Sequence, residues 1–106
     1  MTCESCILIP SYNEERTIGS IVRKLKDREF TVYVVDDGSS DNTALRAAEG
    51  GAILIKNDVN MGKGAALRNG FNRILADSGF NSVIIMDGDD QHDIDDIEHL
   101  IKKARE

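Results

Sequence analysis

Four short apolar runs alternate with helical patterns along this chain, and this alternation constrains its fold more than any other feature. The runs are typical of buried strands because they consist mostly of aliphatic and β-branched residues; they lie at residues 6–10, 30–35, 52–55 and 82–86. Strand–helix alternation predicts parallel strands, right-handed crossovers and helices on both faces of the sheet. We therefore predict an α/β fold, a three-layer sandwich around a mainly parallel sheet with the strand order 3-2-1-4.

Each predicted strand is followed by a segment with apolar residues on one helical face. Asn13 is a candidate N-cap of the first helix, and Glu14 then lies in the first turn, where the helix dipole favours acid. In the third helix, we expect Phe71 and Leu75 on the buried side. Asp93 is expected to open a fourth helix.

Length and charge limit the classes of function. The 106 residues are enough for one domain with its own core, which we place at residues 1–106. The net charge of -6 argues against nucleic acid as a partner, because phosphate backbones attract an excess of Lys and Arg. No run approaches the roughly 20 apolar residues of a membrane-spanning helix. The first residues do not resemble a signal peptide, so we expect a cytoplasmic protein.

The fourth apolar run leads directly into an acidic segment at residues 87–93. Asp87 and Asp89 are separated only by Gly88. Two carboxylates so close together repel each other unless a positive charge lies between them. A divalent cation that carries a diphosphate meets this need. The alternative is an acidic turn that caps the next helix.

The predicted topology brings further polar residues to the same place, because parallel strands end at one edge and open α/β sheets bind ligands there. The residues expected at this edge are Pro10, Tyr12, Glu14, Asp36, Asp37, Asp87, Gly88 and Asp89. Lys63 and Arg68 lie between the third and fourth strands, where they can reach a phosphate. Together these groups predict a nucleotide-diphosphate site. Each also has a plain structural explanation: Tyr12 as a half-buried turn residue, Glu14 as a partner of the helix dipole, and the Asp36–Asp37 pair as turn chemistry.

Four segments, in this order, resemble the signatures of family 2 glycosyltransferases with the GT-A fold. They are IPSYNEE at residues 9–15, VVDDGSSDNT at 34–43, NMGKGAALRNGF at 60–71 and MDGDDQHD at 86–93. The most similar branch is that of dolichol-phosphate mannose synthase, which has a similar metal motif followed by Gln-His-Asp. Gly88 stands where alanine is common in this motif.

The resemblance implies a nucleoside pocket at the first two motifs. Pro10, Tyr12 and Glu14 would contact the nucleoside. Val35 and Asp37 would hold the base.

The resemblance also implies a diphosphate and metal site at the later motifs. Asp87 and Asp89 would form the D-x-D pair that binds Mg²⁺ or Mn²⁺. Gly88 would lie behind the nucleotide-sugar and Gln91 near the sugar or the metal. Lys63 is a further candidate contact of the nucleotide-sugar.

Members of this branch transfer a sugar from a nucleotide diphosphosugar, such as GDP-mannose or a UDP-sugar, to a polyprenyl phosphate. The resemblance therefore implies a metal-dependent transferase that acts on a polyprenyl phosphate or another acceptor. Such enzymes usually continue with an acceptor region, so the alternative is a nucleotide-sugar-binding fragment without turnover, and no catalytic base is assigned. The membrane would be reached only through the acceptor or a further C-terminal part. A homodimer through an exposed apolar edge is a further expectation.

Two other classes of α/β domain also use acidic residues at strand ends. An NAD-binding domain is disfavoured because the first strand is followed by PSYNE rather than by G-x-G-x-x-G. A phosphoacceptor receiver domain is disfavoured because neither Pro10 nor Ile55 is followed by an aspartate at the strand end.

Overall fold

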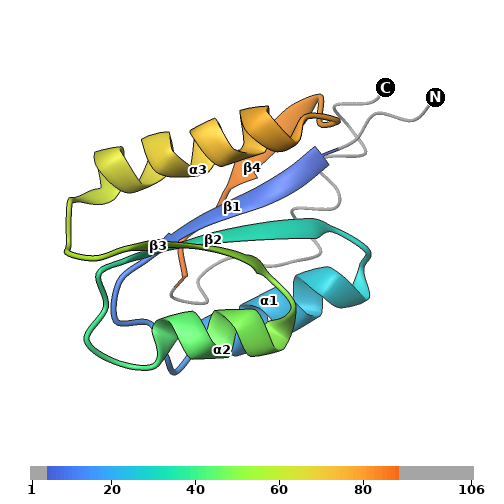
Figure 1. Cartoon of the computed structure of the whole chain (residues 1–106). Coiled ribbons are helices and arrows are strands. Elements are labelled where there is room, and N and C mark those ends of the chain that lie inside the picture. Colours follow the sequence, from blue (N-terminus) through green and yellow to red (C-terminus); the bar gives the residue numbers. More distant parts are fainter. Residues whose placement is uncertain (1–4, 89–106) are drawn as a thin grey trace.

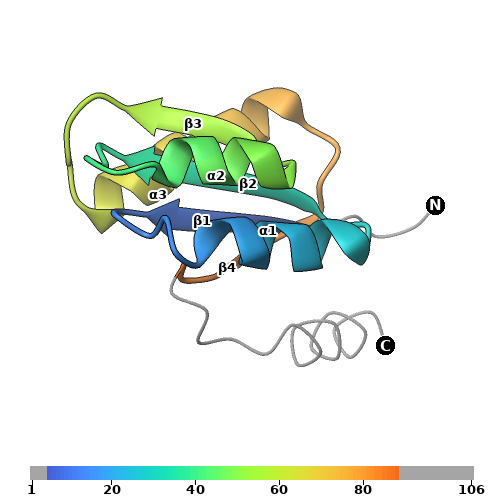
Figure 2. The same cartoon turned by 90° about the horizontal axis from the view of Figure 1, so that it is seen from below.

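The computed structural model describes residues 5–88. Its four strands form one parallel sheet in the order β3-β2-β1-β4. The strands are β1 (Ser5–Ser11), β2 (Thr31–Asp37), β3 (Ile53–Asn57) and β4 (Ser82–Ile85), and the helices are α1 (Ile18–Asp27), α2 (Thr43–Gly50) and α3 (Lys63–Asp77). Helix α3 covers one face of the sheet, and α1 and α2 lie side by side on the other (Figures 1 and 2). The predicted fold class and strand order are therefore confirmed.

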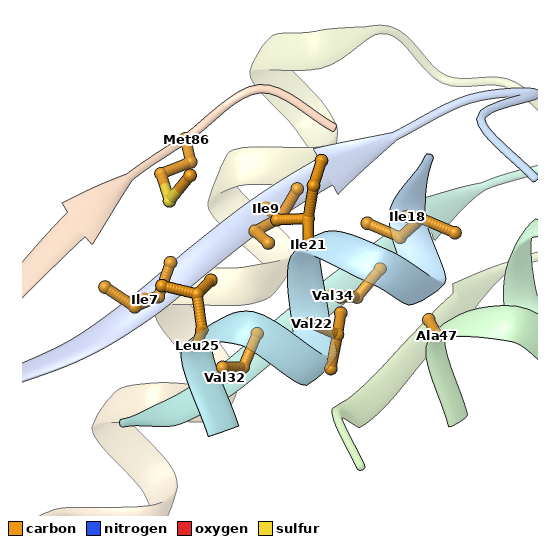
Figure 3. Packing of buried hydrophobic residues seen from close by; sticks show 10 residues of the cluster. All are labelled: Ile7, Ile9, Ile18, Ile21, Val22, Leu25, Val32, Val34, Ala47 and Met86. Atoms are coloured by element: carbon orange, nitrogen blue, oxygen red, sulfur yellow. The ribbon is translucent and has the colours of Figure 1, made fainter. Parts of the chain in front are cut away.

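The central strands are apolar on both faces because helices cover both sides of the sheet. Along β1, Ile7 and Ile9 point toward α1, whereas Cys6 and Leu8 point toward α3. Figure 3 shows the first of these two cores, in which Leu25 and its neighbours on α1 pack against β1 and β2. Because β1 and β2 are buried on both faces, they hold the loops at their carboxyl ends in place.

Helix α1 begins later than predicted. Its first residue is Ile18, and no acidic side chain lies in its first turn. Asn13 is therefore not its N-cap, and Glu14 precedes the helix. Instead, Asn13 has a φ of 53° and its Oδ1 accepts a hydrogen bond of 2.9 Å from the backbone N–H of Ser40. A contact between two loops, rather than helix capping, determines the role of this residue.

Helix α3 packs on the sheet through a stripe of mostly small residues. Its buried residues are Ala66, Gly70 and Ile74. A Cβ on Gly70 would lie 2.5 Å from a methyl group of Leu8, so the helix approaches the sheet too closely for any larger residue. The expected burial of Leu75 is wrong, because its side chain is 75% exposed on the outer part of the helix, and Phe71 is 36% exposed.

The predicted fourth helix, which was expected to open at Asp93, lies outside the described residues. Within residues 5–88, none of the helices has the length and apolar character needed to cross a membrane.

Candidate functional site

A pocket of about 300 Å³ lies at the carboxyl ends of β1, β2 and β4. Seven of the predicted site residues line it, namely Pro10, Tyr12, Glu14, Asp37, Lys63, Asp87 and Gly88. The pocket also includes Ser11, Asn60, Gly62 and Ala66, which the sequence analysis did not single out. Predicted residues from three separate strand ends are thus brought together around one cavity.

Three further predicted residues are described but do not line this pocket. The side chain of Val35 is fully buried in the core between the sheet and α3, so it does not line the pocket. Asp36 points to the opposite face of the sheet from Asp37, and its Oδ1 accepts a hydrogen bond from the backbone N–H of Ser39. Arg68 is exposed on α3 and is not among the pocket residues. Asp89 and Gln91 fall outside the described part of the chain.

The β1–α1 loop is tied to the β2–α2 loop by backbone hydrogen bonds. The N–H of Asn13 donates to Oγ of Ser39 at 2.9 Å, and the N–H of Glu14 donates to Oγ1 of Thr43 at 2.8 Å. Tyr12 lies next to these anchor points, and its side chain remains 46% exposed. The loop therefore presents an accessible aromatic ring at the pocket while its backbone is held in place.

Asp37 is buried and holds the segment before α3. Its Oδ1 accepts hydrogen bonds from Nδ2 of Asn57 and from the N–H of Met61, and its Oδ2 accepts one from the N–H of Gly62, each at 2.9 Å. Burial alone would raise the pKa of Asp37, but these three hydrogen bonds outweigh burial and hold the pKa below its ordinary value. The carboxylate is therefore charged at neutral pH.

Gly38 allows two loops to meet beside Asp37. It has a φ of 73°, and a Cβ at this position would lie 2.4 Å from the backbone N of Asn60. Only glycine combines this left-handed conformation with so close an approach. The turn after β2 therefore packs closely against the segment that contains Asn60 and Gly62, which line the pocket.

The pocket lining also includes a pair of opposite charges. Nζ of Lys63, the first residue of α3, lies 3.0 Å from Oδ1 of Asp87, the second residue after β4. Both side chains are at least half exposed, so this pair contributes little to stability. Its importance lies in placing a cationic and an anionic group at one accessible point of the pocket.

Gly88 is packed against the first motif. Oγ1 of Thr17 donates a hydrogen bond to the carbonyl oxygen of Gly88. A Cβ on Gly88 would lie 2.7 Å from Oγ of Ser11, a buried hydroxyl with no hydrogen-bond partner among the described residues. The space that an alanine side chain would fill is therefore occupied by the Ser11 hydroxyl.

The pocket offers oxygen ligands to a hard divalent cation, but the described residues contain no group of three or more His, Cys, Asp or Glu side chains that could hold one alone. Mg²⁺ and Mn²⁺ prefer oxygen ligands. The carboxylate of Asp87 supplies such ligands at the pocket, and the buried, unpartnered hydroxyl of Ser11 belongs to the same pocket lining.

Asn57 does not line the pocket but donates a hydrogen bond to Asp37, and the sequence analysis missed it. It ends β3, directly opposite Asp37 in the parallel register. The rule that polar residues gather at carboxyl strand ends would have identified it, because it follows the third apolar run after a single lysine.

Comparison with known proteins adds family information. Residues 6–106 match the family model described as glycosyl transferase family 2. A protein of Methanocaldococcus jannaschii without an assigned activity is 35% identical over 105 residues, which cover 93% of this chain and 46% of that protein. The UDP-N-acetylglucosamine–dolichyl-phosphate N-acetylglucosaminyltransferase of Methanococcus voltae is 31% identical over 114 residues, which cover 91% of this chain and 45% of that enzyme. The chain thus spans less than half the length of these two relatives.

Solved structures give the same result. Mannosyl-3-phosphoglycerate synthase from Rubrobacter xylanophilus aligns with a TM-score of 0.68 and 27% identity over 86% of this chain and 32% of that one. Glucosyl-3-phosphoglycerate synthase from Mycobacterium tuberculosis, in complex with Mn²⁺, UDP and phosphoglyceric acid, aligns with a TM-score of 0.65 and 29% identity over 81% of this chain and 33% of that one. The resemblance seen in the four sequence motifs is confirmed, and the chain belongs to glycosyl transferase family 2.

Proposed function

We propose that residues 1–106 form the nucleotide-sugar-binding domain of a metal-dependent glycosyltransferase. The observation that carries this proposal is that Tyr12, Asp37 and Asp87, from the ends of three parallel strands, line the same pocket. Its volume of about 300 Å³ is at the lower end of the range typical of small-molecule sites. It combines an accessible ring, a buried carboxylate and an exposed pair of charges, which suit the base and the diphosphate of one ligand.

The pocket residues have two roles in this proposal. The ring of Tyr12 stacks on or frames the base, and Asp37 accepts a hydrogen bond from the base or the ribose. The ammonium group of Lys63 attracts the diphosphate. Mg²⁺ or Mn²⁺, held by Asp87 and Asp89, would act as a Lewis acid for the departing diphosphate. The solved M. tuberculosis enzyme with Mn²⁺ and UDP supports this choice of ligands.

The acceptor that we propose is a polyprenyl phosphate, supported by the dolichyl-phosphate acceptor in the name of the M. voltae relative. A phosphate oxygen of the acceptor forms a bond to the anomeric carbon while the bond from that carbon to the diphosphate oxygen breaks. The nucleoside diphosphate leaves with the electron pair. Because an ionised phosphate is already a nucleophile, this step requires no protein base. The cytoplasmic location, access to the membrane through the acceptor and a homodimer stay predictions.

A second candidate is a nucleotide-sugar-binding unit without turnover of its own. The two candidates share the same ligand and differ only in catalysis.

Binding and transfer assays separate these candidates. We expect calorimetric titration to show that UDP or GDP binds in the presence of Mn²⁺, and that Asp87→Asn weakens this binding. Asp27→Asn is the matched control, because Asp27 is an exposed carboxylate at the end of α1 remote from the pocket. Sugar transfer to a polyprenyl phosphate supports the enzyme, and binding without transfer supports the binding unit. If neither nucleotide binds, both candidates are wrong.

A further inference from the structure

A hydrogen-bonded network of three polar side chains connects three elements of the fold. Nδ2 of Asn69, on α3, donates to Oδ1 of Asn57, at the end of β3, at 2.9 Å. Nδ2 of Asn57 in turn donates to Oδ1 of Asp37, at the end of β2, also at 2.9 Å. Asn57 and Asp37 are only 7% and 4% exposed. In such surroundings each hydrogen bond is strong and each missing partner is costly.

Asn57, the middle residue of this network, has to be an amide. Asn57 has to donate to a carboxylate and accept from an amide, and its side chain supplies one group for each. An aspartate at this position would place a second carboxylate against Asp37. A leucine of similar size would leave Asp37 without its side-chain donor. The residue type therefore follows from the two bonds it makes rather than from packing.

The hydrogen bonds fix Asp37 in one orientation. Its Oδ1 receives two donors, from Asn57 and from the N–H of Met61. Its Oδ2 receives one donor within the described part of the chain, the N–H of Gly62. A carboxylate oxygen has room for a second donor. Because Asp37 also lines the pocket, a ligand bound there could supply this second donor.

We propose that Asn57 and Asn69 are positioning residues that hold the carboxylate of Asp37 ready to accept an N–H donor from the base of a nucleotide. The inference rests on the proposed function, because it assigns Asp37 to the base. It also implies a preference. Uracil and guanine present a ring N–H on the edge where cytosine presents a bare nitrogen. A carboxylate that faces this ring position should therefore favour UDP or GDP over CDP, whose only donor on that edge is the exocyclic amino group.

Binding by amide variants tests this inference. With Mn²⁺ present, we expect Asn69→Ala to weaken binding of the preferred nucleoside diphosphate by about 3- to 10-fold, the usual effect of one lost hydrogen bond. Binding of inorganic pyrophosphate should change by less than about twofold, because pyrophosphate has no base. In an Asp37→Asn background, Asn69→Ala should have no further effect on nucleotide binding. Asn72→Ala, which removes an exposed amide from the same helix, is the matched control and should bind as the wild type does.

The outcomes separate this inference from the proposed function. Equal losses for nucleotide and pyrophosphate, or no loss in Asn69→Ala, would show that the amides serve only the fold. If the wild type binds pyrophosphate but no nucleotide, the proposed function and the ligand of the inference are both wrong.

Measuring the pKa of Asp37 by NMR tests the hydrogen-bonded network without any ligand. Replacing Asn57 by leucine should raise the pKa of Asp37, because one of the bonds that lower it is lost. An unchanged pKa of Asp37 would overturn the inference even if nucleotides bind, provided that circular dichroism shows the variant to be folded.

Discussion

Replacing Gly88 by alanine is expected to destabilise the fold because the space beside its Cα is already filled. A Cβ on Gly88 would lie 2.7 Å from Oγ of Ser11, so one of the two groups has to move. Backbone conformation is not the obstacle, since Gly88 is not one of the glycines with a positive φ. Forcing an extra carbon into a packed site costs about 1–3 kcal/mol, and we expect Gly88→Ala to lower the free energy of unfolding by this amount.

The clash involves one atom, so removing that atom should relieve it. When Ser11→Ala is combined with Gly88→Ala, the nearest contacts of the new Cβ become Glu14 Cγ and Ile18 Cδ1, both at the ordinary distance of 3.5 Å. Ser11→Ala alone should be nearly neutral, because this hydroxyl has no hydrogen-bond partner among the described residues. We therefore expect a favourable coupling energy of about 1–2 kcal/mol in the double variant.

Urea unfolding followed by circular dichroism measures this coupling. The wild type, the two single variants and the double variant give the four free energies of unfolding that a double-mutant cycle requires. Simple additivity of the two substitutions would refute the reasoning, as would a Gly88→Ala variant as stable as the wild type. Either result would also remove the explanation for a glycine where alanine is common in the family.

Three further predictions concern stability, acid sensitivity and charge. Gly70→Ala should lower the free energy of unfolding, because the new Cβ would lie 2.5 Å from a methyl group of Leu8 on the sheet. Gly64→Ala on the same helix meets nothing within 4 Å and should raise the free energy of unfolding by up to about 1 kcal/mol through helix propensity. Changes of the same sign in urea unfolding would contradict this prediction. Because its pKa is lowered, Asp37 stabilises the fold at pH values above its ordinary pKa of 3.8, and this stability is lost as the pH falls through the folded-state pKa. Asp37→Asn should therefore lose less stability in acid than the wild type does. The same dependence of the free energy of unfolding on pH in both proteins, measured by urea titration, would argue against this prediction. Lys63→Ala should leave stability nearly unchanged, because the ion pair between Lys63 and Asp87 is exposed. The same variant should weaken nucleoside diphosphate binding in calorimetry. A large loss of stability with normal binding would mean that Lys63 serves the fold rather than the ligand.

The architecture and the grouping of the candidate site residues were predictable from the sequence because both depend on local patterns. Apolar runs and helical periodicity predict the parallel sheet, and the carboxyl-edge rule then places Tyr12, Asp37 and Asp87 together without any knowledge of side-chain contacts. The structure confirms the sheet and shows these three residues around one pocket.

Features that depend on contacts between distant segments could not be predicted. Asn13 has the residue type and position of an N-cap, yet its partner is Ser40, a residue in another loop. Leu75 fits the helical pattern, but the close approach at Gly70 directs a different stripe of α3 toward the sheet. Val35 carries a motif position but lies in the core. Local patterns do not specify which of several compatible tertiary contacts forms.

The most direct test of the central claim is to locate the bound cation by NMR. Mn²⁺ broadens the amide signals of nearby residues, and its effect is measured with and without UDP or GDP. The account predicts that Mn²⁺ with the nucleotide broadens the signals of Gly62, Asp87 and Gly88, which belong to the pocket, and leaves that of Gly51 at the end of α2 sharp. Nucleotide-dependent broadening at Gly51, or none at the pocket residues, would contradict it.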